Sequence, residues 1–172
     1  MGTGKMPKFV GNAEQKVDAK GRVSIPSGFR KVIDIADAAR VPGQRPTFYI
    51  AYGNTERPCL EGYTTAGLED LHAKIDALEE GSEGRELAEY LYYTCVRDFQ
   101  PDEEGRIVLP QDLREQLGLT GSAIFVGFGD RFEIWDAAAY RSVEMARSAE
   151  LLKAKGKGYR PQSLFKKSPE QG

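Results

Sequence analysis

The chain has 172 residues, of which 40% are hydrophobic and 29% charged, and its formal net charge is −2. This composition is typical of a globular chain with one large or two small domains. No apolar run approaches the roughly 18 residues that a membrane span needs, so a membrane partner is not expected.

The slightly acidic balance argues weakly against a nucleic-acid partner, but the charge is unevenly distributed. Positions 1–31 hold seven Lys or Arg against two acids, positions 69–104 hold three against twelve, and positions 141–172 hold eight against three. An acidic protein of this kind can still present one positive face, although a mixed, solvated surface explains the charges equally well.

The first residues and the cysteines indicate the compartment. The opening sequence MGTGKMPKF lacks the apolar segment of a secretory signal, so we expect a cytoplasmic protein. Cys59 and Cys95 are too few and too far apart for a disulfide framework or a zinc site, and we expect reduced, buried thiols. Neither a metal nor another cofactor is predicted.

One short sequence occurs twice. Positions 18–30 read DAKGRVSIPSGFR, and 84 residues later positions 102–114 read DEEGRIVLPQDLR. Five of the thirteen positions are identical and three more are apolar in both copies. A repeat of this quality indicates a duplicated supersecondary unit.

Each copy predicts the same succession of elements, because Asp and Gly favour a tight turn and Pro suits the start of a helix. For the first copy we expect an extended segment at 9–17, a turn at 18–22 and a strand at 23–25. A short helix then follows Pro26, with Phe29, Val32 and Ile33 on its apolar face. Strands at 47–53 and 59–63 come next, and the copy ends with an amphipathic helix marked by Leu68, Leu71, Ile75 and Leu78. A helix at about 83–96 then joins the copies.

The second copy continues in the same order. We expect an extended segment at 94–100, a turn at 102–106, a strand at 107–109, a helix from Pro110 to a Gly118 stop, strands at 122–129 and 131–135 joined by Gly129-Asp130, and a last helix capped by Asp136. The predicted organisation is therefore a first repeat at 9–80, a connecting helix at 81–96, a second repeat at 97–145, and a basic, disordered tail at 150–172.

A single unit of this kind would leave sheet edges and an apolar face open. Two units packed about a pseudo-two-fold axis can cover one another. We therefore expect an α+β fold, a duplicated β-barrel flanked by helices.

The stretches DAKGRVSIP, DEEGRIVLP and VGFGDRFEIW resemble the MraZ family of bacterial transcriptional regulators, over about positions 9–143. The resemblance implies a swapped-hairpin AbrB-like barrel, with repeats of the SpoVT-AbrB type, that is also found in MazE-type antitoxins. It implies ring-shaped homo-oligomers in the nucleoid that bind double-stranded DNA through Asp18 with Arg22 and Asp102 with Arg106. It further implies G-containing direct repeats as the target, upstream of the division and cell-wall gene cluster that includes the regulator's own gene and is repressed by it.

The sequence departs from the family pattern in three places, one of which is a tail beyond Ala149 that is longer than the core requires. Positions 37–46 resemble a lengthened loop, and Glu103 and Glu104 make the second turn acidic where the first turn has Lys20. Equal contact of both turns with DNA is therefore in doubt.

The two turn arginines allow two interpretations. Arg22 and Arg106 can present a planar fork to guanine or phosphate, or each can merely bridge to the Asp four residues earlier. The resemblance favours DNA contact, with Arg22 the stronger candidate because Lys16 and Lys20 flank it. These lysines, with Lys8 upstream, are predicted to contact phosphate.

The repeated Arg30 and Arg114 are either phosphate contacts or a brace between the halves, and we favour the brace. Trp135, Phe132 and Phe128 are expected to be core or inter-subunit anchors rather than base-stacking platforms.

Two other classes of function were weighed. An enzyme is not expected, because the one histidine, His72, has no metal-ligand spacing or nucleophile partner, and no phosphate-binding glycine loop is present. An antitoxin-like or protein-binding module of the same fold is the alternative, with Leu164 and Phe165 of the tail as contacts, although two fused units argue against it.

Overall fold

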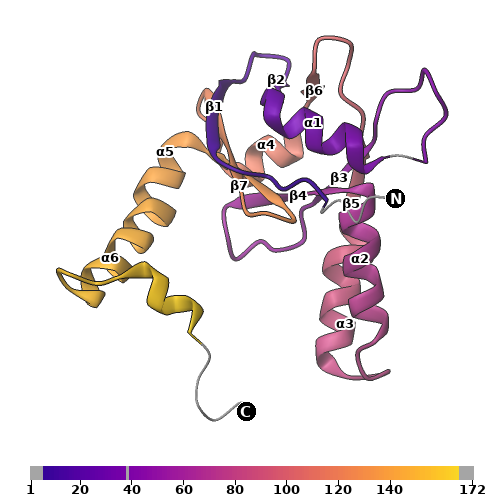
Figure 1. Cartoon of the computed structure of the whole chain (residues 1–172). Helices are drawn as coiled ribbons and strands as arrows, with labels where there is room; N and C mark the ends of the chain where they lie inside the picture. Colours follow the sequence, from indigo (N-terminus) through magenta and orange to yellow (C-terminus); the bar gives the residue numbers. More distant parts are fainter. Residues whose placement is uncertain (1–5, 38, 167–172) are drawn as a thin grey trace. The chain divides into compact units, whose positions relative to one another are not determined.

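A computed structural model describes residues 6–37 and 39–166 (Figure 1). The chain divides after Ala137 into two compact units, and the first unit holds every strand. The architecture is α+β, as predicted. No helix of the described residues is long and apolar enough to cross a membrane.

The first unit is built on a six-stranded antiparallel sheet with the order β1-β7-β8-β4-β3-β5. Its strands, in chain order, are β1 (Asn12–Lys16), β3 (Phe48–Ala51), β4 (Cys59–Thr64), β5 (Val96–Phe99), β7 (Ser122–Gly127) and β8 (Phe132–Asp136). Two further strands, β2 (Arg22–Ser24) and β6 (Arg106–Val108), pair with one another in a separate antiparallel ribbon.

The two halves of this unit exchange their first strands. β1 belongs to the first repeat but pairs with β7 of the second, with Asn12 opposite Val126. β5 belongs to the second repeat but pairs with β3 of the first, with Phe48 opposite Phe99. The order of the six-stranded sheet is consequently the same from either end when β1 is matched with β5, β3 with β7 and β4 with β8.

The expected barrel is not what the structure contains. Within the described residues the six-stranded sheet is open, with β1 and β5 as its two end strands. The remaining strands, β2 and β6, do not extend this sheet, because they hydrogen-bond to each other. The two strands of the ribbon, β2 and β6, lie side by side in Figure 1.

Two short helices pack on the core face of the sheet. α1 (Ser27–Ala36) follows Pro26, and α4 (Gln111–Leu117) follows Pro110 and ends at Gly118, whose φ of 63° is left-handed. Their apolar faces join the strands in one buried cluster, as the sequence predicted. Members contributed by the two helices are Phe29, Val32, Ile33, Leu113 and Leu117.

A pair of helices extends from the sheet away from the ribbon, with α2 (Thr65–Asp76) beside α3 (Glu83–Glu89) (Figure 1). The π-helical segment η1 (Tyr90–Thr94) continues α3. The connecting helix was predicted to reach position 96. It ends earlier because Val96 already pairs with Ala51 in the sheet.

The second unit is helical in its described part. After α5 (Ala137–Ala139) it contains the π-helical segment η2 (Tyr140–Met145), α6 (Ala146–Lys155) and the 3-10 segment η3 (Pro161–Phe165). The predicted disordered tail overlaps these last elements, and its positions 167–172 lie outside the described residues. Cys59 and Cys95 are both buried, as predicted.

Candidate nucleic-acid interface

The first glycine turn is closed by the side chain of Asp18. Its Oδ1 accepts hydrogen bonds from the backbone N–H groups of Lys20 (3.0 Å) and Arg22 (2.9 Å), and its Oδ2 accepts one from Arg22 Nε (2.6 Å). Gly21 has a φ of 87°, which L residues rarely adopt, and its N–H donates to the Asp18 carbonyl. Asp and Gly at this spacing therefore build the turn and present Arg22 at the start of β2.

The second turn has the same construction. Asp102 Oδ1 accepts from the N–H groups of Glu104 and Arg106, each at 2.9 Å, and Gly105 has a φ of 77°. The Arg106 Nε to Asp102 Oδ2 distance is longer, at 3.4 Å. Each arginine is thus tied to its aspartate and still reaches the surface, so the bridge is present and contact with DNA stays a prediction.

The aspartates are held in their ionised form. A hydrogen bond from the backbone N–H of Arg22 is the main cause that lowers the pKa of Asp18 below its ordinary value. The N–H of Arg106 does the same for the pKa of Asp102. At neutral pH each turn consequently carries a carboxylate that positions the guanidinium group beside it.

The ribbon places both arginines on one surface. Arg22 lies opposite Val108, and Ser24 lies opposite Arg106. Val23 and Ile107 are buried beneath the ribbon, so the other residues of β2 and β6 point outward. We call this outward surface the ribbon face, and its residues are Arg22, Ser24, Arg106 and Val108. Arg22 and Arg106 are diagonal neighbours across the two strands, a relation that separates Cα atoms by about 7–8 Å.

The two arginines differ in what remains available for a ligand. Arg22 uses only Nε in its bond to Asp18, and its side chain is 43% exposed, so both terminal amino groups are available. Arg106 is 34% exposed, and its Nη2 is already 3.0 Å from Oε2 of Glu104. The planar fork of Arg22 is the freer of the two.

The flanking charges increase this difference. Lys16 ends β1 immediately before the first turn, and Lys20 lies in the turn itself. In the part of the chain that the structure describes, neither lysine forms an ion pair with a carboxylate. The second turn instead carries Glu103 and Glu104, so the positive end of the ribbon face is the first turn.

Lys8 lies elsewhere. Phe9 bridges to Gly129 at the opposite end of β1 from Lys16, and Lys8 forms an ion pair with Asp130. Eight residues of extended chain separate Lys8 from Lys16, which corresponds to about 25 Å. The structure therefore does not bring Lys8 to the ribbon face, and a phosphate contact by this lysine stays a prediction.

The repeated arginines of the short helices brace the turns, as favoured from the sequence. A Cβ atom on Gly21 would lie 2.5 Å from the Leu109 carbonyl oxygen and 3.0 Å from Arg114 Nε. A Cβ atom on Gly105 would lie 2.7 Å from Arg30 Cζ. The arginine of each half thus packs on the glycine turn of the other half.

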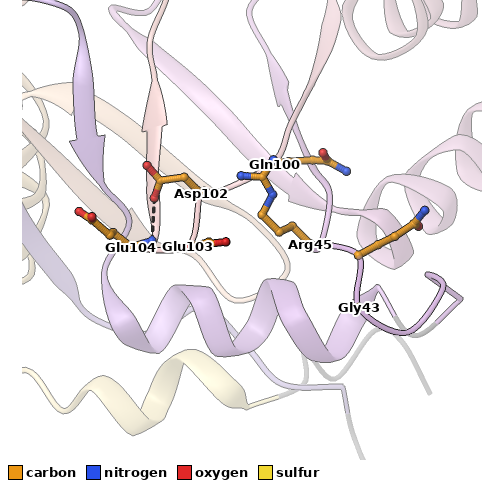
Figure 2. A pocket seen from close by; sticks show the side chains of 7 residues that line it. Gly43, Arg45, Gln100, Asp102, Glu103 and Glu104 are labelled. Atoms are coloured by element: carbon orange, nitrogen blue, oxygen red, sulfur yellow. Dashed lines mark hydrogen bonds between the residues drawn. The ribbon is translucent and has the colours of Figure 1, made fainter.

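An open hollow lies beside the second turn. It is lined by residues 43–45 of the 37–46 loop, by Gln100, and by the acidic residues of the turn (Figure 2). The Arg45 side chain extends from the loop toward the turn in this view. The lengthened loop, which the sequence analysis left without a role, therefore brings a cation to the acidic turn.

Other candidates from the sequence have structural roles. His72 Nε2 is 2.7 Å from the Tyr92 carbonyl oxygen, and its ring stacks on Tyr93. Trp135 and Phe132 are buried, whereas Phe128 is partly exposed beneath the guanidinium of Arg131. Residues 6–37 and 39–166 contain no cluster of His, Cys, Asp and Glu that could hold a metal ion.

Sequence reasoning missed two features of the structure. Ser24 and Val108 belong to the ribbon face, and the alternation of strand residues from Arg22 and Arg106 would have found them. A fully buried carboxylate, Glu133, lies in β8 with Arg57 Nη1 at 3.0 Å and Arg131 Nη2 at 3.1 Å. No local signal marks this network, because Arg57 lies 76 residues away in the chain.

These observations define a class of protein: two repeats that exchange a strand and present paired Asp–Arg turns on one ribbon. Comparison with known proteins identifies the family. The family model described as "MraZ protein, putative antitoxin-like" matches residues 97–157. The chain is 42% identical to the transcriptional regulator MraZ of Ruegeria sp. (strain TM1040) over 145 residues, which cover 84% of this chain and 87% of the relative.

Two more distant relatives carry the same name. Identity is 38% to the transcriptional regulator MraZ of Rhodospirillum rubrum, with 78% of this chain and 83% of the relative covered. It is 36% to that of Gluconacetobacter diazotrophicus, with 88% and 96% covered. The chain belongs to the MraZ family.

Proposed function

We propose that the chain is a DNA-binding transcriptional regulator that places its ribbon face in the major groove. The observation that carries this proposal is the shared outward surface of Arg22 and Arg106, with both terminal amino groups of Arg22 available. The major groove admits a two-stranded β-ribbon, and bidentate Arg to guanine O6/N7 is the commonest specific contact there. The names of the relatives support the same function.

The residues of the site have different proposed roles. Arg22, held by Asp18, reads a guanine, while Lys16 and Lys20 bind phosphate and supply affinity without sequence information. Arg106, held by Asp102, contributes less because Glu104 occupies part of its fork. Lys8 belongs to this set only through the sequence prediction.

One ribbon face has few cations, so a single chain would bind DNA weakly and lose it in salt. We propose that a ring-like homo-oligomer repeats the ribbon face, and that adjacent subunits read G-containing direct repeats with high effective concentration. The proposed target is the control region of the division and cell-wall gene cluster that includes the regulator's own gene. Repression is the proposed outcome, and the cytoplasmic nucleoid is the proposed location.

The strand exchange between repeats supports the assignment of the first unit to the swapped-hairpin AbrB-like fold. Within this proposal, positions 9–80 and 97–145 are the two repeats and positions 81–96 connect them. The tail at 150–172 is accessory. No enzymatic activity is proposed.

The test is a fluorescence anisotropy titration of labelled DNA from the region upstream of the gene, against a shuffled duplex, at several salt concentrations. Arg22→Ala is expected to lower the affinity for the upstream DNA by about 1–3 kcal/mol, or roughly 5- to 150-fold, and to reduce the preference over the shuffled DNA. Arg22→Lys should keep much of the non-specific binding and lose the preference, because lysine has no planar fork.

Lys74→Ala is the matched control, since it removes one exposed positive charge on α2, away from the ribbon. Equal losses for Arg22→Ala and Lys74→Ala would refute the ribbon as the reading surface. Absence of any preferential binding, together with a small protein that co-purifies stoichiometrically, would instead support the antitoxin-like alternative that the description of the family model suggests.

A further inference from the structure

We propose that Arg45 of the 37–46 loop contacts a DNA phosphate beside the second turn, where it takes the place of the lysines that flank the first turn. This inference rests on the proposed function and adds a residue to it. Its basis is the asymmetry of the two turns, which share one backbone construction but differ in the charges around them.

The charge difference is large. The first turn, positions 18–22, has one acid and two bases, and Lys16 precedes it. The second turn, positions 102–106, has three acids and one base, and no lysine or arginine lies between Arg97 and Arg106. Phosphates that approach both ends of the ribbon face would therefore be attracted at one end and repelled at the other, unless a cation from another segment compensates.

The 37–46 loop supplies such a cation at the required place. Arg45 lines the open hollow that Asp102, Glu103 and Glu104 also line (Figure 2). It also borders the adjoining hollow, which Asp102, Glu103 and Gly105 share with α1. Arg45 thus lines two hollows that both border the second turn. The repeated motif has no residue at an equivalent position.

The base of the loop is tethered, so the position of Arg45 is defined. The N–H of Thr47 donates to Asp37 Oδ2 at 2.8 Å, and Gln100 Nε2 donates to Thr47 Oγ1 at 3.2 Å. Only Pro46 separates Arg45 from this anchor at Thr47, which directly precedes β3. The hydrogen bond from Gln100 also ties the loop to the chain that leads into the second turn.

Arg45 is available for an external anion. Within the described residues it forms neither an ion pair nor a hydrogen bond, although acidic groups surround it. The neighbouring Arg40, by contrast, donates to the carbonyl and the carboxylate of Asp34, at 3.0 and 2.5 Å. Arg40 therefore holds the loop in place, whereas the guanidinium group of Arg45 has no hydrogen-bond or ion-pair partner among the described residues.

A phosphate contact has a measurable signature. Removal of one such contact should reduce the slope of log K against log salt by about 0.9, which at 0.1 M salt corresponds to a roughly 5- to 10-fold lower affinity. The preference for upstream over shuffled DNA should stay the same, because phosphate contacts carry no base information. Arg45→Ala is expected to show both effects, and Arg45→Lys should restore most of the affinity.

The competing role for Arg45 is internal, namely neutralisation of Glu103 and Glu104. The two roles are separated by repeating Arg45→Ala in a Glu103→Gln, Glu104→Gln background. A direct contact predicts the same reduction of the salt slope in both backgrounds. An effect that disappears once the two acids are gone would overturn the contact.

Lys74→Ala is the matched control, because it removes an exposed positive charge on α2, away from the ribbon, and we expect it to leave the salt slope unchanged. Thermal unfolding of each variant shows whether the fold is retained. If the unsubstituted protein shows no preferential DNA binding, the proposed function fails. If it binds and Arg45→Ala binds with the same affinity and salt slope, only the present inference fails.

Discussion

The two turn glycines are expected to differ in their tolerance of alanine, although their backbones are nearly the same. Alanine at a positive φ costs about 1–2 kcal/mol at either site. At Gly21 the new methyl group would also lie 2.5 Å from the Leu109 carbonyl oxygen. This obstacle is backbone, and the hydrogen bond from Leu109 N–H to the Gly21 carbonyl (2.8 Å) leaves it little freedom to withdraw.

The structure allows the difference to be estimated. Relief of the clash at Gly21 would sacrifice that hydrogen bond, worth about 0.5–1.5 kcal/mol. The total for Gly21→Ala is then about 1.5–3.5 kcal/mol, or roughly 3–14 °C in Tm for a chain of this size. At Gly105 the obstacle is the side chain of Arg30, which can swing toward solvent, so Gly105→Ala should cost only about 1–2 kcal/mol.

Thermal and urea unfolding of the two variants provide the assay. Gly84→Ala is the control, because Gly84 lies in α3 with no atom within 4 Å of its added methyl group, and alanine there should stabilise by about 0.5–1 kcal/mol. A larger loss for Gly105→Ala than for Gly21→Ala would show that the cross-brace between the halves is not arranged as described.

Two further predictions concern carboxylates. Glu133→Gln should lower the free energy of unfolding by about 1.5–3 kcal/mol, because it weakens the charge-assisted hydrogen bonds from the half-buried Arg57 and Arg131 to the buried carboxylate. Thermal unfolding against Glu80→Gln, at an exposed site, checks this, and equal effects would refute it. The pKa values of Asp18 and Asp102 lie below the ordinary value, so their contribution to stability is present above about pH 4 and is lost as the pH falls through the folded pKa. The amide NMR signals of Arg22 and Arg106 should therefore be constant from pH 5 to 8 and shift in stronger acid. Asp18→Asn should abolish this acid shift for Arg22 alone, and a transition near neutral pH would contradict the assignment.

The local parts of the fold were predictable because their causes are local. The turns follow from Asp and Gly at fixed spacing, the helix starts from Pro26 and Pro110, and the end of α4 from Gly118. Strand positions followed from short apolar runs between these signals. Each of these features depends on residues a few positions apart.

The predicted barrel is not found, because the pairing of strands depends on residues that are far apart in the sequence. The pairing of β2 with β6 joins residues more than 80 positions apart, such as Arg22 and Val108. Periodicity identifies a strand and its buried face, but it does not identify the partner.

In the candidate site, too, only the features with local causes were predictable from the sequence. The repeat placed Arg22 and Arg106 in equivalent turns, and the ribbon brings those turns together. The position of Arg45 could not be foreseen, because it depends on the path of an irregular loop. Lys8 is close to Arg22 in sequence, but the straight course of β1 carries it to the far end of the strand.

The exchange of β1 and β5 also affects how the chain is made. Asn12 has its sheet partner at Val126. At about 5–20 residues per second, a ribosome delivers that partner roughly 5–20 seconds after the amino-terminal strand has been synthesised. Through this interval β1 stays unpaired, and Phe9, which precedes it, lacks its contact with Phe132 of the second half. The nascent first half therefore exposes apolar core residues that a chaperone could bind.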